Sequence, residues 1–478
     1  MSNVTAEAGD LDEKISRHFG EVAFRKGLGA DVGLRDGRNV PTYVEEWLVG
    51  RYANGSSITD EARSRIFSFV RDHLPGKGEK ESLKNRLLDG ETLTILDAYT
   101  ASVDLKSGER RVHVRCIDVD DALVDQDLIA EYPALFTGST WGAGKLVVEP
   151  FKGKNRVCLI DFKPMQAGTA DLPAYKRLRQ YFSLDEWRGL LLRSMGYDPG
   201  SYLPEQQMVI LMRLLPFVQP RVNLMELAPK GTGKSFLYTN LSRYCWVVSG
   251  GKVTAATLFY NNASKMPGLF TRYDVVVLDE GQSIQFDNPS EMAGLMKGYL
   301  ESGEYTRGNN KATADAGMVI LANVPTMRDV PMYPDYIRSL PEIFHESAVL
   351  DRFHGIIPGW EVPRFTAESA ARGMGLKADY LAEVFRQLRG DIEHINFVRS
   401  RVVVGGDKRD ITAVERQAAA LLKLYFPDLQ VSAHEFWTHC VQPAIGLRGR
   451  VRDQLARVDP GSFGGKEMAS IQLKPDAF

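Results

Sequence analysis

The sequence has few cysteines and no long apolar run. Its four cysteines stand singly, without the paired spacing of a zinc site or a disulfide framework, so we expect a reducing compartment. They are Cys116, Cys158, Cys245 and Cys440. No stretch approaches the roughly eighteen apolar residues of a membrane-spanning helix, and the first residues lack a basic or apolar signal region. We therefore expect a cytoplasmic protein without membrane contact.

An excess of charge of either sign is also missing. The chain has 59 lysines and arginines against 61 aspartates and glutamates, with a formal net charge of -2. This balance excludes a uniformly basic coat for nucleic acid, although a local basic patch is compatible with it. With 478 residues, 44% of them hydrophobic, the chain is expected to form roughly two to four folded domains.

Four segments differ in their hydrophobic pattern. Residues 1–90 place apolar positions at helical spacing, whereas residues 91–184 alternate as strands do and predict a small β domain, such as a barrel. Between 185 and 365, short continuous apolar runs alternate with helical patterns, which is typical of a parallel sheet with helices on both faces. Residues 366–478 are predicted to be helical. The predicted fold class is therefore α/β.

The most informative motif is a glycine-rich loop between a predicted strand and a predicted helix. Such a loop turns backbone N–H groups toward phosphates, while Lys234 reaches the β- and γ-phosphates and Ser235 holds Mg²⁺. A chance match in a glycine-rich turn is the alternative, and the flanking strand and helix disfavour it. The predicted contacts of ATP are Ala228, Pro229, Lys230, Gly231, Thr232, Gly233, Lys234, Ser235 and Phe236. Ala228 replaces the glycine of the strict pattern.

A second buried strand ends in two acids. Asp279 is expected beside the metal, and Glu280 is expected to orient or deprotonate an attacking water. The second acid indicates hydrolysis rather than transfer. The alternative is that both acids cap a turn, which fits this strand alone equally well but fits less well after a phosphate loop.

Four further polar residues follow along the chain. A third apolar run ends in Asn323, which can position the same water. Arg352 offers a charged fork suited to the transition state of phosphoryl transfer, although local sequence alone favours a surface pair with Asp351. Arg409 and Arg416 lie two turns apart on one face of a predicted helix, and either of them could sense the γ-phosphate.

The order of these motifs resembles the AAA+ superfamily. The helix of Arg409 and Arg416 is similar to the second sensor helix of its MCM and Lon branches. The resemblance implies an AAA+ P-loop ATPase core with a helical lid, assembled as a hexameric ring, with a single or a stacked double ring left open. It also implies that Arg352 enters the nucleotide site of a neighbouring copy.

Longer phrases resemble the BrxL family of bacterial BREX phage-defence systems, over nearly the whole chain. They include MELAPKGTGKS, VSGGKVTAATLFY, YDVVVLDEGQSI, LPEIFHESAVLDRFHG and RDITAVERQAAALLKLYFP. The resemblance implies a role in phage defence with other BREX proteins as partners. Relatives described as Lon-like carry a Ser-Lys protease domain after the lid, whereas this chain ends soon after its lid helix. We therefore expect an ATPase and not a protease.

A predicted hairpin with its turn at Gly308-Asn-Asn310 carries two basic residues near its tip. In ring motors this position faces the pore, where Arg307 and Lys311 could contact the phosphates of double-stranded DNA without regard to sequence. A solvated surface hairpin is the alternative. If the predicted β domain is a barrel of the OB type, it would be a nucleic-acid platform beside the motor.

Three functions fit these patterns. The first is a ring ATPase that translocates on or clamps double-stranded DNA. The second is a protein remodeller of the unfoldase class, for which the turn from Lys265 to Gly268 lacks the aromatic-glycine step that grips polypeptide, although Tyr260 and Phe270 lie near. The third is a nucleotide-gated scaffold for other defence proteins.

Overall fold

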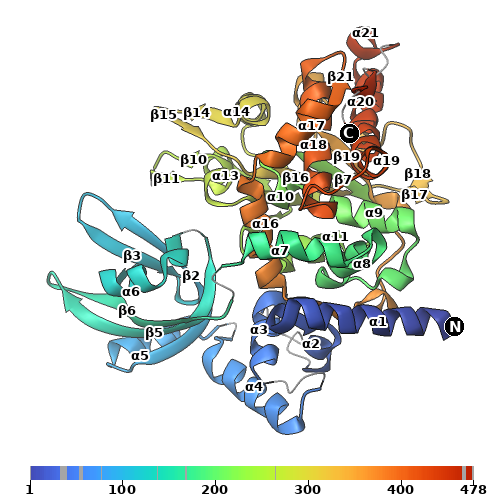
Figure 1. The fold of residues 1–478 in the computed structure, drawn as a ribbon. Helices are drawn as coiled ribbons and strands as arrows, with labels where there is room; N and C mark the ends of the chain where they lie inside the picture. Colours follow the sequence, from blue (N-terminus) through green and yellow to red (C-terminus); the bar gives the residue numbers. More distant parts are fainter. Residues whose placement is uncertain are drawn as a thin grey trace.

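The computed structural model describes residues 2–32, 40–52, 57–76, 78–136, 138–166, 169–263, 265–465, 470–475 and 478. Figure 1 shows a β-barrel set apart from a larger α/β body, with the first helices beside both. The predicted α/β class with a parallel sheet is confirmed. Among the residues that the structure describes, no helix has both the length and the apolarity needed to cross a membrane.

The N-terminal elements divide among three cores, and Leu87 of the last helix belongs to the interior of the barrel. They are α1 (Ser2–Phe19), β1 (Ala23–Arg25), α2 (Gly27–Val32), α3 (Thr42–Tyr52), α4 (Asp60–His73) and α5 (Lys80–Leu88). α1 packs Ile15 and Phe19 into the core of the α/β body, with Phe19 beside Trp187. α3 and α4 share a core with one side of the barrel. The limits of the four segments predicted from the sequence stay predictions.

The alternating segment folds into a closed barrel. Its elements are β2 (Leu93–Asp104), β3 (Glu109–Val114), β4 (Val119–Val124), α6 (Gln126–Glu131), β5 (Thr140–Phe151) and β6 (Lys154–Pro164), and the strand order is β2-β3-β4-β6-β5. The ring of Tyr99 fills the interior and packs against Gly144, where an added Cβ would lie 2.4 Å from that ring. The barrel is thus a packed core, and its assignment to the OB type stays a prediction.

The α/β body is built on a five-stranded sheet. Its strands, in spatial order, are β19 (Gly355–Pro358), β7 (Leu224–Ala228), β16 (Gly317–Asn323), β12 (Val275–Asp279) and β8 (Cys245–Ser249). All four pairings are parallel. The runs at β7, β12 and β16 were predicted as strands and are confirmed, and they are almost completely buried because both faces of the sheet are covered.

Each face of the sheet belongs to its own hydrophobic cluster. One face packs against α8 (Leu184–Ser194), α9 (Pro204–Met212), α10 (Leu215–Val218), α11 (Lys234–Asn240), α16 (Ala378–Gly390) and α18 (Lys408–Tyr425). The other face packs against α12 (Ala255–Leu258), α13 (Leu269–Arg272), α14 (Pro289–Ser302), α15 (Ser347–Leu350) and α20 (Gln442–Val458). Successive strand residues such as Val276 and Val277 alternate between the two clusters, as the strand period of two requires.

Short strands and the remaining helices complete the body. They are α7 (Leu172–Leu178), β9 (Lys252–Val253), β10 (Tyr260–Asn261), β11 (Met266–Pro267), β13 (Gln285–Phe286), β14 (Glu304–Arg307), β15 (Asn310–Thr313), β17 (Thr326–Met327), β18 (Val330–Pro331), β20 (Met374–Leu376), α17 (Glu393–Arg401), β21 (Val402–Val404), α19 (Ala433–Phe436), α21 (Pro460–Phe463) and β22 (Ile471–Leu473). β14 and β15 form the predicted hairpin, and β10 pairs with β11 close to it (Figure 1). β1 pairs with β20, so the beginning of the chain is joined to a segment far along it.

One buried arginine connects the barrel with the α/β body. Arg243 donates from Nη1 to Thr140 Oγ1 of β5 at 3.1 Å and from Nη2 to Glu383 Oε1 of α16 at 2.9 Å. The hydroxyl of Tyr244 donates to the same carboxylate oxygen at 2.8 Å. Because the group is buried and satisfied on several sides, it fixes the barrel relative to the sheet.

Candidate nucleotide site

Three predicted site segments meet at the carboxyl edge of the sheet. β7 ends at Ala228, β12 at Asp279 and β16 at Asn323. β16 lies between the other two strands, and Asn323 is directly opposite Ala228. Ligands of open parallel sheets bind outside the carboxyl ends of the strands, so this edge is the expected place for a nucleotide.

Lys234 is the centre of this edge. Its Nζ donates to Asn323 Oδ1 at 2.8 Å and to Pro229 O at 3.4 Å. Burial lowers the pKa of the Lys234 ammonium, while the negative charges of Glu226 and Asp279 act in the opposite direction. A buried ammonium whose hydrogen bonds among the described residues go to neutral oxygens is well placed to accept an anion such as a phosphate.

The loop between β7 and α11 has a backbone that its glycines require. Gly231 and Gly233 have φ values of +87° and +77°, which are costly for residues with a Cβ. A Cβ at Gly233 would also lie 2.8 Å from Tyr197 Oη, and this hydroxyl donates to Gly233 O at 3.1 Å. Phe365 N donates to Gly231 O at 2.8 Å. The loop is therefore held in its curved form by neighbours on both sides.

A fully buried ion pair between Arg213 and Glu226 packs against the phosphate loop. Arg213 Nη2 lies 2.7 Å from Glu226 Oε1, and Nε lies 3.1 Å from both carboxylate oxygens. The same guanidinium donates to Tyr197 Oη at 2.8 Å and to Thr232 O at 3.3 Å. Sequence reasoning missed this pair. The signal in the sequence was one charged residue inside each of two apolar runs, Arg213 between α9 and α10 and Glu226 in β7, since a charge in a buried run requires a partner.

The second of the two acids, directly after β12, has a constrained backbone. Glu280 has φ +51°, a left-handed conformation that costs about 1–3 kcal/mol for a residue with a side chain. Its N–H donates to Asp279 Oδ1 at 2.8 Å, and its carbonyl accepts from Ser283 Oγ at 2.8 Å. A Cβ at Gly250 would lie 2.9 Å from Glu280 Oε2, so the glycine leaves room for this carboxylate.

The residues at this edge fit a magnesium nucleotide. Mg²⁺ in nucleotide sites takes one or two protein oxygens and completes its shell with phosphates and water. Ser235 and Asp279 offer one hydroxyl and one carboxylate, and Thr232 Oγ1 is buried without a partner among the described residues. Within the same residues no three His, Cys, Asp or Glu side chains form a metal cluster. The donor set therefore matches a metal that arrives with its nucleotide.

A cavity of about 130 Å³ adjoins the loop. Its walls are mostly apolar, and Phe236, which follows the loop and is 37% exposed, lines it. The other apolar lining residues are Met195, Gly196, Leu237, Leu241, Phe365, Ala370, Ala371 and Ala378, and the polar ones are Lys26, Thr42, Glu46, Ser194 and Asn240. Apolar walls beside a polar loop are typical of sites for small ligands.

Arg352 lies at the opposite edge of the same sheet. It lies shortly before β19. Two residues further along, the backbone N–H of His354 donates to the carbonyl of Asn223 at 2.8 Å, and Asn223 directly precedes β7. The five residues of β7 span roughly 16 Å at about 3.3 Å per residue. Arg352 and the phosphate loop of the same chain therefore lie at opposite ends of the strands, about one strand length apart.

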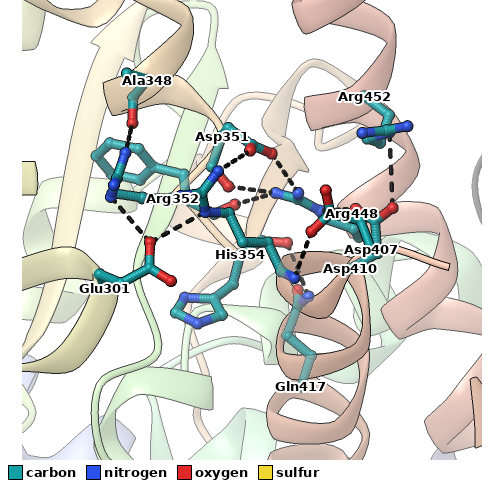
Figure 2. A network of polar contacts seen from close by, with 12 residues as sticks. Glu301, Ala348, Asp351, Arg352, His354, Asp407, Asp410, Gln417, Arg448 and Arg452 are labelled. Atoms are coloured by element: carbon teal, nitrogen blue, oxygen red, sulfur yellow. Dashed lines mark hydrogen bonds and ion pairs between the residues drawn. The ribbon is translucent and has the colours of Figure 1, made fainter. Parts of the chain in front are cut away.

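Arg409 joins Arg352 at this amino edge. Its Nη1 donates to Asp351 Oδ2 at 2.7 Å, and its Nε donates to Glu301 Oε2 at 3.0 Å, an oxygen that also lies 3.0 Å from Arg352 Nε in an ion pair. Figure 2 shows Arg352 between Glu301 and Ala348. Arg448 was missed from the sequence. It is fully buried and binds the Asp351 carboxylate at 2.6 Å.

Arg416 points elsewhere on the same helix. Its Nη1 donates to Arg221 O at 3.1 Å and lies 3.3 Å from His354 Nε2. Burial lowers the pKa of its guanidinium to about 10, and the positive charges of Arg221 and Arg399 add to this effect. Of the two predicted sensor arginines, Arg409 pairs with Glu301, the carboxylate that also pairs with Arg352.

Comparison with known proteins identifies the family of this chain. A family model described as "Lon-like protease BrxL-like, ATPase domain" matches residues 157–469, and one described as "BREX system Lon protease-like protein BrxL N-terminal" matches residues 17–147. The chain belongs to the BrxL family. It thus carries the ATPase domain of that family, and the predicted resemblance is confirmed.

Two BrxL relatives align with nearly the whole chain. The Lon-like protease BrxL of Escherichia coli O9:H4 (strain HS) is 30% identical over 477 residues, which are 98% of this chain and 67% of that protein. The Lon-like protease BrxL of Bacillus cereus (strain H3081.97) is 29% identical over 477 residues, which are 97% of this chain and 68% of that protein. The chain therefore spans about two thirds of their length. That it is not a protease stays a prediction.

The hairpin of this BrxL chain presents its two basic residues differently. Lys311 is exposed, with Nζ 3.5 Å from Glu304. Arg307 is half-buried, and its guanidinium donates to Glu291 Oε1 at 2.9 Å and to Tyr260 O at 2.6 Å. Arg307 thus joins the β14–β15 hairpin to the β10–β11 hairpin and to α14. Lys311 keeps its charge in solvent.

Proposed function

We propose that this BrxL chain is a ring-forming AAA+ ATPase that hydrolyses ATP between adjacent copies and acts on double-stranded DNA in phage defence. One observation carries the proposal. The phosphate loop lies at the carboxyl edge of the sheet, whereas Arg352 and Arg409 lie at the amino edge. If these arginines stabilise the transition state, they must belong to a second copy, and repeated contacts of that kind close a ring such as the hexamer.

Each residue of the carboxyl edge has a role in this mechanism. Lys234 binds the β- and γ-phosphates, Ser235 and Asp279 hold Mg²⁺, and Glu280 takes a proton from the attacking water, which Asn323 helps to orient. Mg²⁺ neutralises phosphate charge when it is bound. The remaining loop residues hold the phosphates through backbone N–H groups.

The cavity beside the loop is proposed to receive the base and ribose of ATP. Phe236 offers an exposed aromatic ring at its wall. Stacking on an aromatic side chain contributes about 1–3 kcal/mol for a nucleobase. Helices α16 to α20 serve as the lid, and Arg409 rather than Arg416 is proposed as the second sensor, because Arg409 shares Glu301 with Arg352.

DNA contact is proposed for the hairpin that carries Lys311. The exposed ammonium suits a phosphate contact, whereas Arg307 positions the hairpin by its contacts with Glu291 and Tyr260. The closed barrel is proposed to be OB-like and to guide the nucleic acid. Other BREX proteins are proposed partners, as the family description suggests.

An unfoldase is the second candidate. Met266 of the β10–β11 hairpin is 47% exposed and follows the exposed Lys265. An apolar side chain on a projecting hairpin suits contact with polypeptide. ATP turnover with and without an unfolded protein would distinguish this function.

The deciding experiment measures ATP turnover of the purified chain with and without duplex DNA of mixed sequence, together with DNA binding at about 50 and 200 mM salt. We expect DNA to stimulate turnover and the higher salt to weaken binding. Turnover that ignores DNA, with no DNA bound at the lower salt, would contradict the DNA function. Sedimentation with ATP and Mg²⁺ should show a hexamer or a double hexamer.

A further inference from the structure

The two arginines at the amino edge share one carboxylate oxygen. Arg352 Nε and Arg409 Nε each lie 3.0 Å from Glu301 Oε2. Two guanidinium groups this close repel each other unless an anion lies between them. Glu301 therefore occupies the anion position of the arginine pair, and its contact with Arg352 can be followed in Figure 2.

The carboxylates on the two sides of the arginine pair differ in burial. On the buried side, Asp351 accepts from Arg409 at 2.7 Å and from Arg448 at 2.6 Å, and Arg448 also binds Asp410 at 2.7 Å. Glu301, on the other side, is 42% exposed. Buried pairs are difficult to break, whereas exposed pairs contribute little and exchange readily. Arg409 is thus fixed from the buried side by Asp351, Arg352 is held by the carbonyl of Ala348, and the outer anion that both arginines share is replaceable.

Glu301 belongs to the element that carries the hairpin. It lies in the last turn of α14, and β14 begins at Glu304. Gly303, with φ +80°, ends the helix, and its carbonyl accepts the N–H of Ala314 at 2.9 Å. A Cβ at Gly303 would lie 2.7 Å from Ala314 O, so both ends of the hairpin meet closely at the helix terminus. A displacement of the hairpin must therefore move Glu301.

We propose that Glu301 is a placeholder anion. It occupies, between Arg352 and Arg409, the position of a nucleotide phosphate from the neighbouring copy, and it restrains hydrolysis until the hairpin withdraws it. A phosphate replaces it because arginine forks bind phosphate through charge-assisted, bidentate hydrogen bonds. The inference rests on the proposed function, since it takes the arginines to act across an interface and the hairpin to contact DNA.

The test is Glu301→Gln, measured as ATP turnover against ATP concentration with and without duplex DNA. We expect turnover without DNA to rise roughly two- to fivefold, the factor that corresponds to an exposed ion pair. The KM for ATP should stay close to that of the wild type, and the stimulation by DNA should shrink by the same factor. The amide keeps the size of the side chain, so melting temperature serves as the check on folding.

Glu346→Gln is the matched control. Glu346 is as exposed as Glu301, but it pairs with Lys297 of α14 rather than with either arginine. We expect it to keep wild-type turnover. The double variant Glu301→Gln/Arg352→Ala should show no rise, because the released arginine is then missing.

Several outcomes would overturn the placeholder role. They are an unchanged rate or a loss of turnover in Glu301→Gln, an equal rise in Glu346→Gln, and a rise that persists without Arg352. The failure of the proposed function looks different. Wild-type turnover that ignores DNA would overturn the DNA function and the withdrawal by the hairpin, while a rise in Glu301→Gln would still support the restraint on the arginines.

Discussion

Two fully buried arginines lie beneath the two edges of the sheet, and they are built alike. Arg213 binds Glu226 and the carbonyl of Thr232 at the carboxyl edge. Arg448 binds the Asp351 carboxylate and the carbonyls of Asp351 and Phe353, at 2.9 and 2.8 Å, at the amino edge. In both cases one guanidinium fixes a turn by holding a carboxylate and main-chain oxygens together.

The two edges differ in what they complete. At the carboxyl edge, Lys234 and Asn323 already contact each other within one chain. At the amino edge, Arg352 and Arg409 are held by the chain but lie far from its own phosphate loop, and their outer partner is the exposed Glu301. The comparison indicates one edge that binds a ligand by itself and another that acts on a ligand held by a neighbour.

Arg352→Ala should have the largest effect on this comparison. We expect turnover to fall by roughly 10³-fold or more with ATP binding retained, because an arginine finger acts on transition-state charge. Mixing this variant with Lys234→Ala chains should restore part of the turnover, since an intact site then meets an intact arginine. Absence of recovery, measured after the subunits have exchanged, would contradict action across an interface.

Substitution of the two buried arginines separates the edges. Arg213→Met leaves the buried Glu226 carboxylate without its guanidinium and should lower the free energy of unfolding by about 3–5 kcal/mol in denaturant titrations. Arg448→Met should lower it by less, because Asp351 keeps Arg409 and Asp410 keeps Arg452. Below their melting temperatures, Arg213→Met should weaken ATP binding, whereas Arg448→Met should spare binding and reduce turnover. If both variants affected the same quantity, the division between the edges would be wrong.

Lys234→Ala should lower the affinity for ATP roughly 100-fold, as expected when a charge-assisted contact of about 2.7 kcal/mol is removed. Lys230→Ala is the control, because the Lys230 side chain is exposed and alanine keeps the backbone N–H through which this loop residue is proposed to contact phosphate. Calorimetric titration with a non-hydrolysable ATP analogue measures both. Equal affinities of the two variants would remove Lys234 from its assigned role.

The smallest effect concerns acid sensitivity at the amino edge. Burial holds the pKa of His354 well below its ordinary value, and the charges of Arg416 and Arg448 lower it further. Below about pH 6.5 the unfolded chain therefore binds a proton at this histidine that the folded chain does not. As the pH falls, the free energy of unfolding decreases by up to about 1.4 kcal/mol per pH unit. His354→Gln should show a flatter dependence between pH 6.5 and 5 in denaturant titrations. A slope equal to that of the wild type would exclude this histidine as the cause.

Sequence patterns anticipated much of the carboxyl edge because its information is local. The phosphate loop, the strand that ends at Asp279 and the strand that ends at Asn323 each lie within one short segment. The hairpin at β14–β15 was also predicted, since its turn residues mark it. These strands and this hairpin are confirmed, and the roles of the site residues stay predictions.

The amino edge and its supports could not be predicted in the same way. Arg448 lies nearly a hundred positions after its partner Asp351, and no local pattern links an arginine in one helix to an acid in a distant turn. The sheet strands β8 and β19 and the barrel strand β4 were also not assigned, because short strands carry a weak periodic signal. Polar pairs between distant elements form only when the whole core is assembled.

The pairing of β1 with β20 has a consequence for synthesis on the ribosome. Phe24 is buried and pairs with Gly375, which lies about 350 residues later in the chain. At about 5–20 residues per second, the ribosome makes Phe24 roughly 20–70 s before Gly375. Until β20 emerges, the N-terminal segment cannot complete its strand pair. The nascent chain therefore keeps β1 unpaired until β20 has been made, and folding must join two segments that leave the ribosome far apart in time.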